Sequence, residues 1–151
     1  MPNPLDRHID ALQRATRDLL AVAMRSVEEV TDLSMPQMRM LFALQDHGTL
    51  PSGALAHVLE VSGSSVTRLA DRLCAGGYVQ RTASAEKRSL VLLSLTDAGS
   101  GAVEAVLRRR DDEFRDALAE LDPELRDQLS AGLTALHGHL SATSLSRAVV
   151  A

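Results

Sequence analysis

The N-terminal part of the chain carries a helical pattern of apolar side chains. From Pro4 to about Val30 they recur at three- and four-residue steps, at Leu5, Ile9, Leu12, Leu19, Ala23, Val27 and Val30. This spacing places them on one stripe of a long helix, in which proline is tolerated only at the start. Ser34, with Pro36 in the first turn, predicts the N-cap of a second helix, which ends at His47 and Gly48.

Two short helices are predicted next, about three residues apart. Pro51 and Ser52 open the first helix, and Ser62 caps the second. The second helix ends at Gly76–Gly77, because glycine readily adopts the left-handed conformation that closes a helix. This arrangement fits a helix-turn-helix.

A β-hairpin is predicted directly after these helices. Residues 78–82 and 89–95 are short and rich in Val, Leu and Thr, and the polar stretch ASAEKR lies between them. The hairpin therefore has an exposed basic tip, and a hairpin in this position makes the helix-turn-helix a winged one.

The C-terminal third predicts two more helices. Thr96 or Asp97 caps a long fifth helix, and Asp122–Pro123 restarts the chain as a sixth. The sixth helix carries a near-heptad stripe at Leu125, Leu129, Leu133, Leu136 and Leu140, and a tail that we expect to fray follows Ser141.

These elements predict a single domain, residues 1–151, that is mainly α with a small β-hairpin wing. The winged helix-turn-helix covers about 34–99, and long helices at about 4–31 and 97–142 frame it. The apolar stripes of the first and sixth helices are too long for one small domain to bury. We therefore expect two copies to bury them against each other, in a homodimer.

Composition changes this picture little. The chain of 151 residues has a net charge of −4, but residues 51–99 carry five basic and four acidic groups, so the middle is locally basic. The single Cys74 excludes an intrachain disulfide. No segment reaches the ~20 apolar residues of a membrane span and no signal peptide begins the chain, so we expect a cytoplasmic protein that binds no membrane.

The helix after Ser62 is the candidate recognition helix. Ser64, Ser65, Arg68 and Arg72 lie opposite its apolar side, with Thr67 on the flank. Small hydroxyls let the backbone approach DNA, and each arginine offers a bidentate fork for guanine or a clamp for phosphate. The predicted DNA contacts in full are Ser62, Ser64, Ser65, Thr67, Arg68, Arg72, Arg81, Lys87 and Arg88.

Asp71 lies among these residues and would repel phosphate. We expect it to pair with Arg68 or with an arginine of the wing, and to hold that guanidinium in position. An arginine of the wing can enter an adjacent minor groove.

The stretch from Leu33 to Gly99 resembles the core of the MarR family of regulators. SSVTRLADRL followed by GGYVQR, then the pairs Leu95–Thr96 and Ala98–Gly99, carry the resemblance. It implies a homodimer formed by the first, fifth and sixth helices, with recognition helices in major grooves and wings in minor grooves. It also implies a repressor that binds a pseudo-palindromic operator of double-stranded DNA and is released by a small lipophilic or aromatic effector.

The wing departs from the family pattern. The family has Asp-x-Arg, five residues, then Leu-Thr, whereas here Glu86-Lys87-Arg88 is followed by six residues before Leu95–Thr96. A one-residue shift would turn every side chain of the strand over, so we expect a β-bulge to absorb it. The direction of Arg88 is therefore left open, and Arg81 is the more secure basic contact.

Three alternatives stay open. Cys74 could sense oxidants, the five histidines could sense a metal although none stands at ligand spacing, and a winged-helix module without DNA binding would suit the net acidity. Four methionines, at positions 24, 35, 38 and 40, suit either an effector pocket or ordinary core packing. No motif indicates an enzyme, and we expect no cofactor or resident metal.

Overall fold

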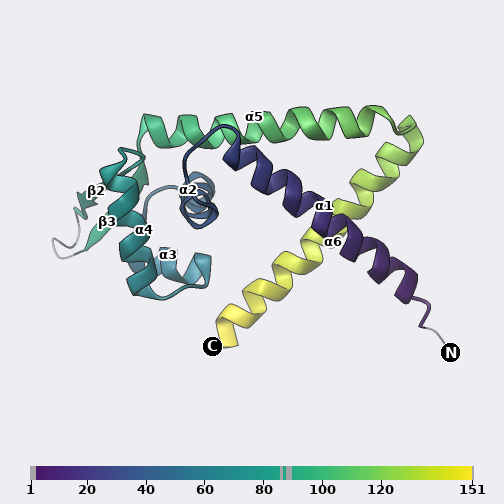
Figure 1. The fold of residues 1–151 in the computed structure, drawn as a ribbon. Helices are drawn as coiled ribbons and strands as arrows, with labels where there is room; N and C mark the ends of the chain where they lie inside the picture. Colours follow the sequence, from purple (N-terminus) through teal and green to yellow (C-terminus); the bar gives the residue numbers. More distant parts are fainter. Residues whose placement is uncertain (1–2, 86, 88–89, 151) are drawn as a thin grey trace. The chain divides into compact units, whose positions relative to one another are not determined.

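The computed structural model is mainly helical, with one small sheet (Figure 1). It describes residues 3–85, 87 and 90–150, of which residues 142–150 are described by their backbone alone. The elements in chain order are α1 (Asp6–Glu28), α2 (Met35–His47), β1 (Leu50–Pro51), α3 (Ser52–Leu59), α4 (Gly63–Ala75), β2 (Val79–Ala83), β3 (Val91–Leu95), α5 (Asp97–Ala119) and α6 (Pro123–Val150). The chain up to Asp111 forms one compact unit and the chain from Asp112 forms a second.

The predicted helix starts are confirmed by their hydrogen bonds. Ser34 and Gln37 form a capping box, in which the Gln37 side-chain oxygen accepts from the Ser34 N–H at 2.9 Å. The Ser62 hydroxyl accepts from the Ser65 N–H at 3.2 Å, and Asp122 accepts from the Leu125 N–H at 3.0 Å. The backbone of α6 stays helical past Ser141, so the expected fraying of its tail is wrong.

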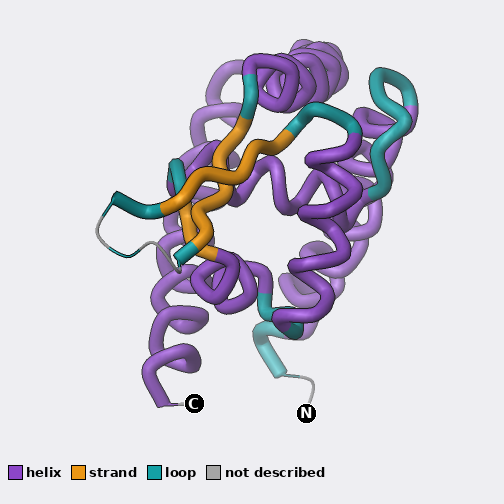
Figure 2. The backbone as a smooth tube through the Cα atoms, turned by 90° about the vertical axis from the view of Figure 1, so that its left-hand side faces the viewer, coloured by secondary structure: helices purple, strands orange, loops and turns teal. Residues whose placement is uncertain are grey.

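The sheet has three strands rather than the two of a hairpin (Figure 2). Its order is β1-β3-β2, and all pairs are antiparallel. Sequence reasoning missed β1, in which Leu50 pairs with Leu93 and Pro51 with Leu92. A two-residue strand is too short to show alternation, and its proline is tolerated because β1 is an edge strand.

The expected β-bulge is also wrong. β2 and β3 pair at five consecutive positions, from Val79 opposite Leu95 to Ala83 opposite Val91. β3 begins at Val91, so the extra residue of the wing lies in the loop and does not disturb the register. The described part of this loop is held by two backbone hydrogen bonds, from the Leu90 N–H to the Lys87 carbonyl and from the Ser84 N–H to the Leu90 carbonyl, both 2.9 Å.

The hydrophobic core lies within the first unit and consists of Leu, Val, Met and Ala side chains. Met38, Met40 and Leu41 of α2 are fully buried. The core is completed by Val27, Ala43, Leu44, Leu55, Leu59, Val66, Ala70, Leu73, Val79, Leu93, Val103 and Val106. Two of the four methionines considered for an effector pocket are therefore core residues, whereas Met24 is 41% exposed.

The start of α5 is fixed to the turn between α4 and β2. Gly77, with a φ of 78°, supplies the left-handed residue of this turn, whereas Gly76 is right-handed. The Thr96 hydroxyl donates to the Gly77 carbonyl at 2.6 Å and accepts from the Gly99 N–H at 3.1 Å. Gly99 lies so close to the backbone of Tyr78 that a Cβ at position 99 would be 2.1 Å from the Tyr78 carbonyl oxygen. Only glycine fits this approach.

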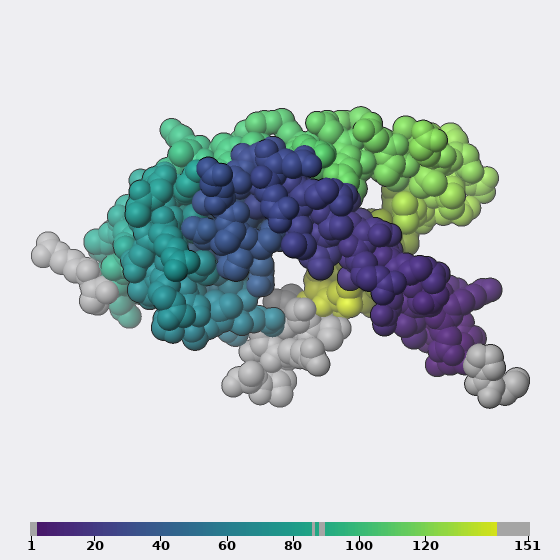
Figure 3. All heavy atoms as spheres, in the orientation of Figure 1, coloured from purple at the N-terminus to yellow at the C-terminus, as the bar shows by residue number. Residues whose placement is uncertain are grey.

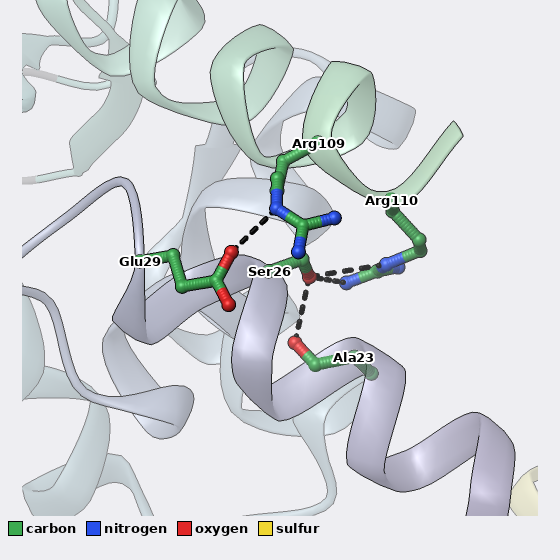
Figure 4. A network of polar contacts seen from close by, with 5 residues as sticks. All are labelled: Ala23, Ser26, Glu29, Arg109 and Arg110. Carbon is green, nitrogen blue, oxygen red and sulfur yellow. Dashed lines mark hydrogen bonds and ion pairs between the residues drawn. The ribbon is translucent and has the colours of Figure 1, made fainter. Parts of the chain in front are cut away.

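α1 and α5 meet at a polar contact inside the first unit (Figure 4). Ser26 of α1 is fully buried; its hydroxyl donates to the Ala23 carbonyl at 2.8 Å and accepts from Nη2 of Arg110 at 3.3 Å. The Arg110 guanidinium also lies 5.5 Å from the centre of the Phe42 ring, a cation–π distance. Arg109 pairs with Glu29 at 2.5 Å. This junction joins α1, α2 and α5 by charge as well as by apolar packing.

Candidate nucleic-acid interface

α4 has one face in the core and one face in solvent. Val66, Ala70 and Leu73 are at most 1% exposed, which anchors the helix. All of the predicted contact residues on α4 lie on the other side: Ser64, Thr67, Arg68 and Arg72 are exposed, and Ser65 is half-buried. The buried face therefore fixes α4 in the core, and the opposite face is exposed to solvent.

The turn between α3 and α4 is closed by a residue with an uncommon conformation. Glu60 has φ 54° and ψ 46°, the left-handed region, and ends α3. Arg39 of α2 donates from Nη2 to the Leu59 carbonyl at 3.3 Å, which satisfies one of the last carbonyls of α3. These contacts position Ser62, the N-cap of α4.

A cluster of hydroxyls surrounds the N-terminus of α4. The Ser62 oxygen lies 3.0 Å from that of Ser64 and 2.9 Å from that of Ser65. Nη2 of Arg68 donates to the Ser65 hydroxyl at 3.4 Å. The hydroxyl of Thr67 donates to the Gly63 carbonyl at 3.1 Å. The small side chains leave the backbone of the first turn accessible, as close approach to DNA requires.

Asp71 of α4 pairs with Arg81 of β2. Nη2 of Arg81 lies 2.6 Å from Oδ1 of Asp71, and both side chains remain partly exposed. The hydrogen bond that Arg81 donates to the Asp71 carboxylate raises the pKa of Arg81 above its ordinary value. The expectation that Asp71 pairs with an arginine of the wing is confirmed, and Arg68 is not its partner. The carboxylate that spoke against DNA binding is thus neutralised locally.

A shallow hollow of about 260 Å³ lies on the flank of α4. It is lined by Pro36, Val61, Ser65, Arg68, Leu69 and Arg72. None of these residues is acidic. Sequence reasoning predicted the serine and the two arginines as contacts, but it missed Pro36, Val61 and Leu69, whose apolar character gave no sign of a surface site.

The structure brings most of the predicted residues together. Six of them lie along α4, from its N-cap Ser62 to Arg72 in its last turn, and Arg81 is joined to that helix through Asp71. Lys87 is exposed in the loop of the wing. Arg88, together with Glu86, lies outside the described residues.

The other candidate sites gain little support. Within the described ranges, no three His, Cys, Asp or Glu side chains lie close enough together to hold a metal ion. Cys74 is a free, half-buried thiol on α4. No helix in the described part of the chain is both long and apolar enough to cross a lipid bilayer.

Comparisons with known proteins agree with this geometry. The model of the MarR family matches residues 31–88. YfiV of Bacillus subtilis, named an uncharacterised HTH-type transcriptional regulator, is 34% identical over 105 residues, which cover 70% of this chain and 66% of YfiV. MdtR of the same organism, named an HTH-type transcriptional repressor, is 39% identical over 74 residues, which cover 49% of this chain and 48% of MdtR. The chain thus spans just under two thirds of the first relative and about half of the second.

The whole fold is found in a solved structure. The crystal structure of RV1404 from Mycobacterium tuberculosis matches with a TM-score of 0.85 and 30% identity, over 91% of this chain and 95% of that one. The family model, the regulators similar in sequence and this nearly complete structural match lead to the same assignment. The chain belongs to the MarR family of transcriptional regulators and carries their winged helix-turn-helix DNA-binding fold.

Proposed function

We propose that this regulator is a repressor that binds a pseudo-palindromic operator as a homodimer and responds to a small ligand. The exposed face of α4 is the observation that carries the proposal. Its hydroxyls and arginines stand on a helix fixed from behind by Val66, Ala70 and Leu73, so they reach outward from a rigid support. Such a helix enters the major groove, where an arginine donates two hydrogen bonds to guanine.

The wing supplies the second DNA contact in this proposal. Arg81 is held by Asp71 beside the recognition helix, and Lys87 extends the positive charge along the hairpin. Arginine and lysine side chains are attracted to the negative potential of a narrow minor groove. We assign the wing, including Arg88, to the minor groove next to the major groove that α4 enters.

Exposed apolar side chains on two helices support the homodimer. Leu5, the N-cap of α1, is 58% exposed and Leu20 of α1 is 54% exposed, and the N-terminal half of this helix extends away from α2–α4 (Figure 3). On α6, Leu125, Leu129, Leu133 and Leu140 are 39–60% exposed. Apolar stripes of this length mark an interface, and a second copy would cover them symmetrically. The two-fold axis then places the half-sites about 10 base pairs apart.

The proposal includes repression and a response to a small ligand. MdtR, which is similar over half of the chain, is named a repressor, and a dimer bound at a promoter represses by occupying it. Met24 is exposed near the end of α1 and Met35 is half-buried at the start of α2, so these two methionines are the ones available to a lipophilic effector. We propose that the effector is an aromatic or lipophilic small molecule. We also propose that the protein is cytoplasmic and has no catalytic activity.

The test is binding of the purified protein to labelled DNA from its own upstream region, with salt and unrelated competitor as variables. We expect tight, competitor-resistant binding that weakens with salt, because phosphate contacts release counterions. If upstream DNA fails, selection from a random pool provides the operator. Failure of both would overturn the proposal in favour of a protein-interaction module.

The variant Arg68→Ala tests whether Arg68 belongs to the face of α4 that recognises the operator. We expect it to lower operator affinity by about tenfold and to relax base preference at one position of each half-site, since one bidentate contact discriminates by about 1–3 kcal/mol. Its dimerisation, measured by light scattering, should be unchanged. Operator binding equal to that of the wild type would remove Arg68 from the recognition face.

A further inference from the structure

The hollow on the flank of α4 is positively charged without compensation. It contains two guanidinium groups, of Arg68 and Arg72, and the hydroxyl of Ser65, and no acidic residue lines it. Asp71 is adjacent to Arg72 in sequence, but its carboxylate is bound 2.6 Å from Arg81 of β2. The Asp71 carboxylate, the nearest one along the helix, therefore pairs with an arginine of the wing and does not neutralise the arginines of the hollow.

The arginines of the hollow are almost unpartnered. The guanidinium of Arg72 forms no hydrogen bond or ion pair with any residue that the structure describes, and that of Arg68 forms one long bond, 3.4 Å, to Ser65. Elsewhere, the guanidinium groups of Arg81, Arg109 and Arg110 are each held by a side chain. An unpartnered guanidinium beside a hydroxyl is the chemistry that binds a phosphate, and the second cation, that of Arg68, adds to the positive potential of the hollow.

Arg68 and Arg72 differ in their direction around the helix. At about 100° per residue, Arg68 lies about 40° and Arg72 about 80° from Ser64, toward the flank that carries Ser65 and Leu69. The buried residues Val66, Ala70 and Leu73 lie opposite Arg68, which is therefore closest to the centre of the exposed face, whereas Asp71 and Arg72 lie about 50° to either side of that centre. In a helix that lies in the major groove, the centre faces the base edges and the flanks face the sugar–phosphate walls.

We propose that this hollow receives a phosphate group of the DNA backbone, with Arg72 as its clamp and the Ser65 hydroxyl as a second donor, whereas Arg68 reads bases. The inference rests on the proposed DNA binding and divides the work between two arginines that the sequence does not distinguish. The other residues that line the hollow, Pro36, Val61 and Leu69, are apolar and offer a phosphate no competing charge. A contact of this kind fixes the register of the helix on DNA and carries no base preference.

The test compares four variants on two duplexes, the selected operator and an unrelated sequence of equal length, by fluorescence anisotropy over a range of salt. Arg72→Ala should weaken binding to both duplexes by a similar factor, about tenfold, and should lower the slope of log affinity against log salt by about 0.9 for each protomer bound. Arg72→Lys should keep the slope and lose less than threefold, because lysine binds phosphate as a point charge.

Arg68→Ala should weaken binding to the operator far more than to the unrelated duplex. Arg108→Ala on α5 is the control for the loss of one exposed positive charge, and its salt slope should equal that of the wild type. Equal thermal melting of all four variants would show that the fold is kept.

The proposal fails if Arg72→Ala leaves the salt slope unchanged, or if its loss is confined to the operator and Arg72→Lys does not restore it. The second result would make Arg72 a reader of guanine. If the wild type binds neither duplex, the proposed function fails and this inference fails with it, so the two failures are distinguishable.

Discussion

Gly99 allows a sharp test of how α5 is attached to the DNA-binding unit. Replacing it with alanine would place a Cβ 2.1 Å from the backbone oxygen of Tyr78, about 1 Å inside normal contact, and a backbone atom cannot rotate away. Alanine gains about 1 kcal/mol of helix propensity over glycine, whereas overpacking of this kind costs about 1–3 kcal/mol or more. The clash is with a backbone atom, and relieving it would disturb the two hydrogen bonds of the Thr96 hydroxyl. We therefore place its cost at the top of that range. The net destabilisation is therefore about 2 kcal/mol.

Gly101 is the matched control, because it lies two residues later in the same helix and a Cβ there meets nothing within 4 Å. Gly101→Ala should stabilise by about 0.5–1 kcal/mol. At about 2–4 °C per kcal/mol, the two variants should differ in melting temperature by about 5–12 °C. Circular dichroism at 222 nm, at one protein concentration, measures this difference. Gly99→Ala melting with or above Gly101→Ala would refute the reasoning.

Three further predictions concern other elements. Glu60→Gly should raise the melting temperature by about 1–3 °C, because it removes a left-handed strain of about 1–2 kcal/mol but adds freedom to the unfolded chain, whereas Glu60→Ala should give no gain. Asp71→Asn should lower DNA affinity severalfold in an anisotropy titration although it removes a negative charge, since Arg81 loses its partner; higher affinity would show that Asp71 only repels DNA. Ser34→Ala should lower the free energy of unfolding in urea by about 1 kcal/mol through loss of the capping box, and Ser34→Asp should keep most of it.

Local chemistry explains what the sequence predicted well. Ser34, Ser62 and Asp122 cap helices because each is a short polar side chain placed just before a helical pattern, and each accepts the expected N–H. The two faces of α4 follow from its 3.6-residue period. The pairing of Asp71 with Arg81 could be anticipated because an isolated carboxylate among cations finds a partner. These features depend on residues close in sequence, or on charge alone.

Long-range contacts explain the features that could not be predicted from the sequence. β1 exists because β3 offers a free edge, which nothing in the dipeptide Leu50–Pro51 shows. The expected bulge followed from counting residues to Leu95, but that count cannot tell whether an extra residue lies in a strand or in the loop. The hollow needs Pro36 and Leu69, 33 positions apart in the numbering of the chain, to meet beside Arg72. The role of Ser26 depends on Arg110, 84 residues later.

The two-sided construction of α4 has a consequence for how this regulator can evolve. Ser64, Thr67 and Arg68 are exposed and contribute nothing to the core. Val66, Ala70 and Leu73 are buried and pack α4 against the core. If α4 binds DNA as proposed, substitutions at the first set should change the DNA sequence that is preferred without reducing the population of folded protein. Duplicated genes could therefore acquire new operators through a few surface changes, each tolerated on its own, while the buried residues of the same helix stay under selection for folding.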